Sequence, residues 1–198
     1  MARRMGRTLV EELVPRMDPA SLAAATREAA LAVDGEPEAF SVLGVGAGTA
    51  KLSLDEHRAV DVALNEAFAR GLRDSGEVSH LAFMSAVGAD PTASTSGSGA
   101  AGMARYNRVK GEAEQAVRAS GPAIVSVFRP AMIIGSQHTP WLLEKALPLF
   151  SFVIPGKFRS ISVDQIAKSM IATAKRHPRV SETYHYPEMM ALIAGATP

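Results

Sequence analysis

The chain has 198 residues, of which 47% are hydrophobic and 21% are charged, and its 21 basic and 20 acidic side chains leave a formal net charge of +1. This composition is typical of one globular domain with a substantial core. It argues against wholesale disorder and against a charge field that attracts nucleic acid or an anionic membrane. Cysteine is absent, which excludes disulfides, thiolate catalysis and cysteine-based zinc sites.

The first residues, MARRMGRTL, are basic, with arginines at Arg3, Arg4 and Arg7. No apolar block follows them, so a secretory signal is not expected, and a mitochondrial address is an alternative to the cytoplasmic location that we expect. The most apolar stretch, ALPLFSFVIPG at residues 146–156, is short and contains two prolines. We therefore expect no integral membrane segment.

Strand-like and helix-like segments alternate along the rest of the chain. Short apolar runs that end at glycine, serine or proline predict buried strands, and apolar residues at helical spacing predict helices packed on them. The expected elements are a strand at 39–44, a helix at 56–72, a strand at 78–85, a helix at 106–119, a strand at 123–130, a helix at 164–176 and a short strand at 183–186. This alternation predicts an α/β fold with a parallel sheet and right-handed crossovers.

The carboxyl ends of the first three expected strands are candidate ligand-binding positions. Ligands of open parallel sheets bind beyond these ends, so Gly44, Ser85 and Arg129 are expected around one crevice. The stretch TASTSGSGAAG, residues 92–102, consists of small and polar residues and follows the second of these strands. It is expected to be a surface loop, either a spacer or a flap beside the site.

The segment YNRVK places Tyr106 and Lys110 four residues apart, a spacing that puts two side chains on one face of a helix. A lysine near a phenol favours the phenolate and lowers its pKa, which lets a tyrosine exchange a proton near neutral pH. Ser85 adds a hydroxyl that can hydrogen-bond a substrate carbonyl oxygen. The three side chains suit carbonyl reduction by a nicotinamide, while an ordinary amphipathic helix with a surface lysine is the alternative.

The segments SVLGVGAGTAK, SAVGAD, YNRVKGEAE, SVFRPAMIIG and ISVDQIAKSM, in this order, resemble the atypical short-chain dehydrogenase/reductases of the Tat-interacting-protein type. The resemblance covers about residues 2–176. It implies a Rossmann-like, doubly wound parallel sheet that binds NADP(H) rather than NAD(H), and a small carbonyl or alcohol substrate. It implies an active site of Ser85, Tyr106 and Lys110. Members also act as regulatory partners in transcription and trafficking, so a non-catalytic binding protein is the alternative function.

The resemblance also implies which residues bind the cofactor. Lys110 would contact the nicotinamide ribose, residues 130–133 would line the nicotinamide and residues 43–45 would lie against the adenosine. Arg3 and Arg4 would meet the 2′-phosphate, unless they form a solvated or targeting basic end. The expected cofactor-binding set is Arg3, Arg4, Leu43, Gly44, Val45, Tyr106, Lys110, Pro130, Ala131, Met132 and Ile133.

In the family, the second strand ends at the position that Arg3 and Arg4 occupy, so the first strand and the glycine motif that binds pyrophosphate have no counterpart. We therefore expect an N-terminally truncated fold in a single domain, 1–198, with residues 1–35 as the remnant of the second and third strand region. A fragment of a longer coding sequence is an alternative. The run GVGAG at 44–48 has Gly-x-Gly-x-Gly spacing and follows the family's fourth strand, so it is not expected to be the phosphate loop.

Loss of the first two strands would expose the apolar edge of the strand at 40–43. An open edge invites pairing. We expect the segment before Gly35, a second copy of the chain or another protein partner to cover it.

Residues 136–162, which include Trp141 and a run of apolar residues, are expected to form a lid over the substrate, with core packing as the alternative. The five histidines lack metal-ligand spacing, so no metal site is expected. Basic patches interleaved with aromatic residues are absent, so nucleic-acid binding is not expected.

Overall fold

A computed structural model describes residues 17–95, 100–134 and 156–195 of the chain. The basic pair Arg3 and Arg4 and residues 136–155 of the predicted lid lie outside these ranges. Within them, no helix has both the length and the apolar composition that crossing a bilayer requires.

Four parallel strands form the central sheet in the order β1-β2-β3-β6. Their bounds are β1 (Ala39–Ser41), β2 (His80–Met84), β3 (Ile124–Phe128) and β6 (Thr183–Tyr184). Leu81 of β2 lies opposite Ala39 on one side and Val125 on the other, so β2 and β3 are the inner strands. The predicted α/β class is confirmed, and the three long predicted strands lie where the sequence placed them.

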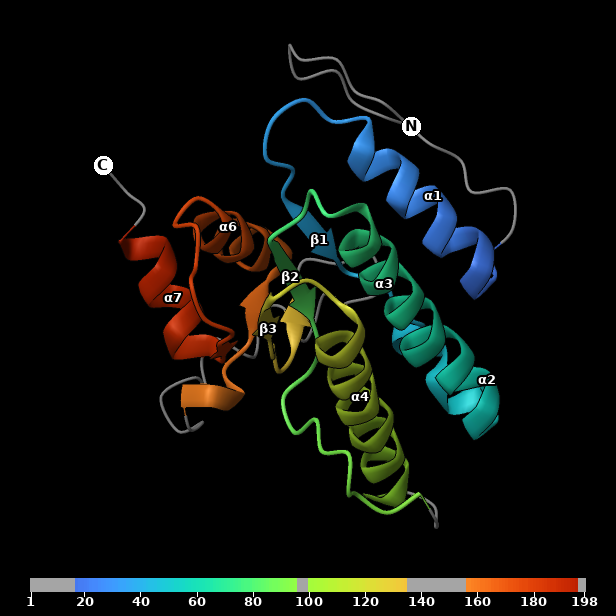
Figure 1. Cartoon of the computed structure of the whole chain (residues 1–198). Helices are drawn as coiled ribbons and strands as arrows, with labels where there is room; N and C mark the ends of the chain where they lie inside the picture. Colours follow the sequence, from blue (N-terminus) through green and yellow to red (C-terminus); the bar gives the residue numbers. More distant parts are fainter. Residues whose placement is uncertain (1–16, 96–99, 135–155, 196–198) are drawn as a thin grey trace.

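Helices cover both faces of this sheet (Figure 1). One face carries α1 (Pro19–Leu31), α3 (Asn65–Ser75) and α4 (Ala100–Ser120). The other carries α6 (Val163–Ala174) and α7 (Tyr186–Ala194). This is the doubly wound arrangement that the sequence predicted.

Several short elements complete the fold. α3 continues a helical run that begins with α2 (Leu54–Arg58) and passes through a π-helical turn, η2 (Ala59–Leu64). The other elements are the 3-10 helices η1 (Gly46–Lys51) and η3 (Gly156–Phe158), and a separate parallel pair of β4 (Ile133–Ile134) with β5 (Ile161–Ser162).

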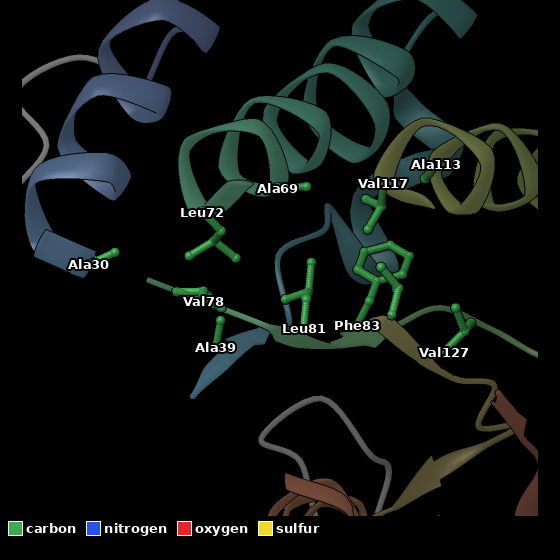
Figure 2. Packing of buried hydrophobic residues seen from close by; sticks show 11 residues of the cluster. Ala30, Ala39, Ala69, Leu72, Val78, Leu81, Phe83, Ala113, Val117 and Val127 are labelled. Carbon is green, nitrogen blue, oxygen red and sulfur yellow. The ribbon is translucent and has the colours of Figure 1, made fainter. Parts of the chain in front are cut away.

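The strands divide their side chains between the two helical layers. Successive strand residues point to opposite faces of a sheet. Leu81 and Phe83 of β2 therefore point toward Ala69 of α3 and Val117 of α4 (Figure 2), while Ala82 joins a second cluster with α6 and α7. All three of these β2 side chains are 0% exposed, so the inner strand anchors both layers.

The region that forms α1 was not predicted to be helical. Asp18 caps this helix by accepting hydrogen bonds from the backbone N–H groups of Ala20 and Ser21. The backbone of α1 lies directly against α3. A Cβ at Gly71 of α3 would be only 2.4 Å from the carbonyl oxygen of Ala23 in α1. α1 thus packs on the helical layer and does not extend the sheet beside β1.

Within the described residues, β1 pairs with β2 alone and forms the margin of the sheet. Phe40 and Val42 are 40% and 60% exposed there. An apolar groove of about 460 Å³ runs between α1 and β1 and includes Leu22, Phe40 and Leu72 in its lining. The open apolar edge that the sequence predicted is present among these residues.

Candidate active site

Tyr106 and Lys110 project from the same side of α4, one turn apart. The ammonium nitrogen of Lys110 lies 5.7 Å from the centre of the Tyr106 ring. Lys110 is only 6% exposed, so it is a buried residue and not the surface lysine of an ordinary amphipathic helix. A lysine is rarely buried without a charged partner.

The partner of Lys110 is Asp61, a residue that the sequence analysis missed. Asp61 lies in the π-helical turn η2, and its Oδ1 is 2.5 Å from Nζ of Lys110, with its side chain fully buried. The backbone N–H of Val45 donates to Oδ2 at 3.0 Å. Burial alone would raise the pKa of Asp61, but the His57 ring, the Lys110 ammonium and the Val45 amide lower it to about 2. The pair is therefore ionic at neutral pH.

His57 completes this buried cluster, although its spacing in the sequence indicated no metal-binding or catalytic role. Its ring stacks on Tyr106 with the centroids 6.0 Å apart and an angle of 21° between planes. Nε2 is 3.8 Å from Oδ2 of Asp61, beyond hydrogen-bond length, and neither ring nitrogen has a hydrogen-bond partner among the described residues. His57 thus lies against both the ring of Tyr106 and the carboxylate of Asp61.

The pKa of Tyr106 is raised, contrary to the expectation that Lys110 would lower it. Burial of the phenol is the largest cause; Lys110 lowers the pKa, and the negative charge of Asp61 raises it again. From the sequence, only the effect of the lysine was predicted. In the structure, burial outweighs Lys110 and the carboxylate of Asp61 acts in the same direction as burial, so Tyr106 is a protonated phenol at neutral pH.

Ser85 lies at the carboxyl end of β2, as expected, but its hydroxyl has another partner. The Oγ donates to Oε1 of Glu114 at 2.5 Å. Glu114 in turn accepts from Nε and Nη2 of Arg129 at 2.9 and 2.6 Å. Ser85 and Arg129 therefore meet through Glu114, and Ser85 shares no hydrogen bond with Tyr106.

The residues predicted to lie against the adenosine, Leu43 to Val45, follow β1 directly. A Cβ at Gly44 would be 3.1 Å from both Nζ of Lys110 and Oδ1 of Asp61. Glycine at this position thus lets the backbone after β1 lie directly against the buried ion pair, where a side chain would crowd it.

The residues predicted to line a nicotinamide follow β3. The carbonyl of Pro130 accepts from the N–H of Val87 at 2.9 Å, and that of Met132 accepts from Ile161 at 2.9 Å. Ala131 and Ile133 are partly exposed and Met132 is 45% exposed. This segment therefore has a backbone held at both ends and a surface that a planar ring can contact.

The glycine run at 44–48 leads into the 3-10 helix η1, and the first α-helix after it begins only at Leu54. It lacks the direct entry into an α-helix that places a pyrophosphate on backbone N–H groups. The described residues thus include no loop of the pyrophosphate-binding kind.

A pocket of about 400 Å³ lies beside Tyr106. Its lining consists of Gly46, Thr49, His57, Gly102, Met103, Arg105 and Tyr106. The glycine run therefore contributes to a pocket at the tyrosine. No group of three or more metal-ligating side chains is found in the part of the chain that the structure describes.

No protein-family model and no curated protein sequence matches this chain. Solved structures do. MoeE5 in complex with UDP-glucose and NAD is 13% identical with a TM-score of 0.53, and the match covers 81% of this chain and 62% of that one. The dTDP-4-dehydrorhamnose reductase of Bacillus anthracis in complex with NADP is 12% identical with a TM-score of 0.55, covering 91% and 67%. The human epimerase family protein SDR39U1 with NADPH is 12% identical with a TM-score of 0.52, covering 81% and 61%.

These likenesses establish the fold. They confirm the predicted Rossmann-like α/β architecture. MoeE5 shares this fold with bound NAD, and the reductase and the epimerase family protein share it with bound NADP and NADPH. The chain spans about two thirds or slightly less of the length of each.

Proposed function

We propose that the protein is an NADP(H)-dependent oxidoreductase that interconverts a carbonyl compound and its alcohol at Tyr106. The observation that carries the proposal is the buried ion pair of Lys110 and Asp61 beneath Tyr106, at the carboxyl ends of the strands. Burying two charges costs desolvation free energy, so a buried ion pair often marks a functional site. Here the pair lies next to a tyrosine, at the edge of the sheet where ligands of such folds bind. The fold shared with NAD(P)-bound reductases supports the same assignment.

In the reductive direction, Tyr106 donates its hydroxyl proton to the carbonyl oxygen. NADPH, when bound, would supply a hydride to the carbonyl carbon and become NADP⁺, while the electron pair of the C=O π bond takes up the proton of Tyr106. The tyrosinate left behind is stabilised by Lys110 and regains a proton from solvent. Because the pKa of Tyr106 is raised, the resting phenol carries the proton that reduction needs.

Ser85 would orient the carbonyl oxygen, but its hydroxyl must first leave Glu114. In the structure its proton is directed to a carboxylate that Arg129 also holds. Rotation of Ser85 away from Glu114 leaves that carboxylate still paired with Arg129. For catalysis, Ser85 must therefore give up its hydrogen bond to Glu114 and donate to the substrate oxygen instead.

The cofactor would contact Lys110 and Tyr106 with its ribose, Pro130 to Ile133 with its nicotinamide, and Leu43 to Val45 with its adenosine. Arg3 and Arg4, outside the described residues, would select the 2′-phosphate. Fluorescence titration with NADPH, with NADH in parallel, tests this. We expect saturable binding that prefers NADPH, weakened by Lys110→Met and Arg4→Ala and unchanged by the control Arg118→Gln.

A non-catalytic NAD(P)-fold binding protein is the second candidate, and one observation favours it. The Ser85 proton is directed to Glu114 and is not free for a substrate oxygen. The two candidates differ in a reduction assay with NADPH and a panel of aldehydes and ketones. Turnover that Tyr106→Phe abolishes supports the oxidoreductase; cofactor binding without turnover of any member supports the binding protein.

A further inference from the structure

The pocket beside Tyr106 lies between η1 and the first turns of α4. Its volume of about 400 Å³ is in the range of small-molecule sites. Gly46 and Gly102 contribute only backbone to its wall, and Thr49 and Met103 add a hydroxyl and a thioether. Tyr106, the proposed proton donor, forms one side, so a molecule in this pocket lies against the reacting group.

The charged side chain in the wall is Arg105. Its Nη2 donates to the carbonyl oxygen of Thr49 at 3.1 Å, which holds the guanidinium across the pocket from α4 to η1. A guanidinium has five N–H donors, so this single bond leaves donors for a ligand.

Arg105 differs from its neighbours in its charge balance. Arg58 and Arg108 both pair with Glu112, each at 2.7 Å. Among the residues that the structure describes, no carboxylate lies within ion-pair distance of Arg105. Within the described part of the chain, the pocket therefore holds an oriented positive charge with no protein anion beside it.

We propose that this pocket is the substrate site and that the substrate is a small carbonyl compound that carries a carboxylate. Arg105 binds the carboxylate, whose two oxygens match the planar guanidinium fork, while the carbonyl oxygen meets the hydroxyl of Tyr106. A 2-oxo acid is the simplest compound of this class. The inference rests on the proposed function, since it assigns Tyr106 its substrate, and the hydride and proton move as described above.

Benzoylformate and its methyl ester test the proposal, because they share a ketone and differ in the negative charge. Ligand-observed NMR would measure their binding with and without NADP⁺, which cannot reduce them. We expect the acid to bind at least about tenfold more tightly than the ester, as a charged hydrogen bond predicts. Arg105→Met should remove this preference, and Arg108→Met, on the same helix but outside the pocket, should leave it within about twofold. Circular dichroism would confirm that both variants are folded.

Equal binding of acid and ester, absence of binding by both, or an unchanged preference in Arg105→Met would overturn the carboxylate site. NADPH oxidation, measured in parallel, separates this failure from that of the proposed function. Reduction of the ester alone, unaffected by Arg105→Met, leaves an oxidoreductase without the carboxylate site. Selective binding of the acid through Arg105, without reduction of either compound, would support the carboxylate-binding pocket and contradict the proposed oxidoreductase function.

Discussion

The Nζ atom of Lys110 lies 2.5 Å from Oδ1 of Asp61, and the two side chains are 8% and 0% exposed. This pair gives Lys110 a role that differs from the one expected of a lysine next to a tyrosine. With its charge balanced by Asp61, Lys110 does not hold Tyr106 as a phenolate in the resting state. Under the proposed function, Tyr106 gives its proton to the substrate, and the positive charge of Lys110 acts on the tyrosinate that forms after the transfer.

Replacement of Asp61 by asparagine should strongly destabilise the protein. The variant keeps the shape of the side chain but leaves the buried Lys110 without a counter-charge, and breaking a buried ion pair typically costs about 3–5 kcal/mol. Denaturant unfolding would measure the loss. Asp164→Asn is the matched control, because Asp164 pairs with Lys168 at 2.7 Å with both side chains mostly exposed, and exposed pairs contribute little. A loss in Asp61→Asn no larger than in the control would contradict a structural role for the pair.

The same pair should make stability depend on pH in the acid range. The pKa of the Asp61 carboxyl is lowered from 3.8 to about 2 in the folded protein. Asp61 therefore contributes stability that is present above its pKa in the unfolded chain. That contribution is lost as the pH falls from about 4 to about 2. The difference in unfolding free energy between wild type and Asp61→Asn should therefore shrink over this window. A difference that stays constant from pH 6 to pH 2 is the opposite result.

Tyr106 should titrate at a lower pH when Asp61 loses its charge. The carboxylate raises the pKa of the phenol, so Asp61→Asn removes a cause of the shift and leaves Lys110 to lower it. Alkaline difference spectra, with Tyr106→Phe subtracted to isolate one phenol, would measure the change. Glu182→Gln serves as the control, because Glu182 accepts from the hydroxyl of Tyr184, whose pKa is raised to about 12. That variant should move the Tyr184 titration and leave Tyr106 unchanged.

Local spacing explains why so much of the site could be predicted from the sequence. Tyr106 and Lys110 are four residues apart on one helix, and Ser85 ends an apolar strand, so both placements follow from helix and strand geometry. The partners of these residues follow from tertiary packing. Asp61 precedes Lys110 by 49 positions in the sequence, and it faces inward within a π-helical turn that periodicity does not reveal. The positions of Ser85, Tyr106 and Lys110 in the fold were thus predicted from local spacing, whereas the carboxylate of Asp61 beside them was missed.

The fold shows the same division between local and distant signals. The alternation of strands and helices predicted the parallel sheet, and the structure confirms it. α1 was missed although Asp18 and Pro19 form a recognisable helix start before an alanine-rich run, because the region was compared with a strand of the resembling family.

Gly71→Ala should destabilise the contact between α1 and α3. The added Cβ would lie 2.4 Å from the carbonyl oxygen of Ala23, so one helix must move, and overpacking of this kind costs about 1–3 kcal/mol. Gly102→Ala provides a control of the opposite sign. A Cβ there meets nothing within 4 Å, and alanine in place of glycine inside a helix stabilises by about 0.5–1 kcal/mol. Thermal or denaturant unfolding would distinguish the two, and equal stability of both variants would show that α1 is not packed as described.

Ser85→Ala should separate a structural from a catalytic use of the serine. In the folded protein the variant removes one hydrogen bond to Glu114, which keeps both bonds from Arg129, so the cost in stability should be about 1 kcal/mol. If Ser85 turns to orient the substrate oxygen, the reduction rate should fall by about 10²-fold or more while the Kd for NADPH changes little. Ser169→Ala is the matched control, because Ser169 is also buried and donates to the carbonyl of Ile166 within α6, away from the site. A reduction rate that falls equally in both variants would mean that Ser85 acts only through the fold.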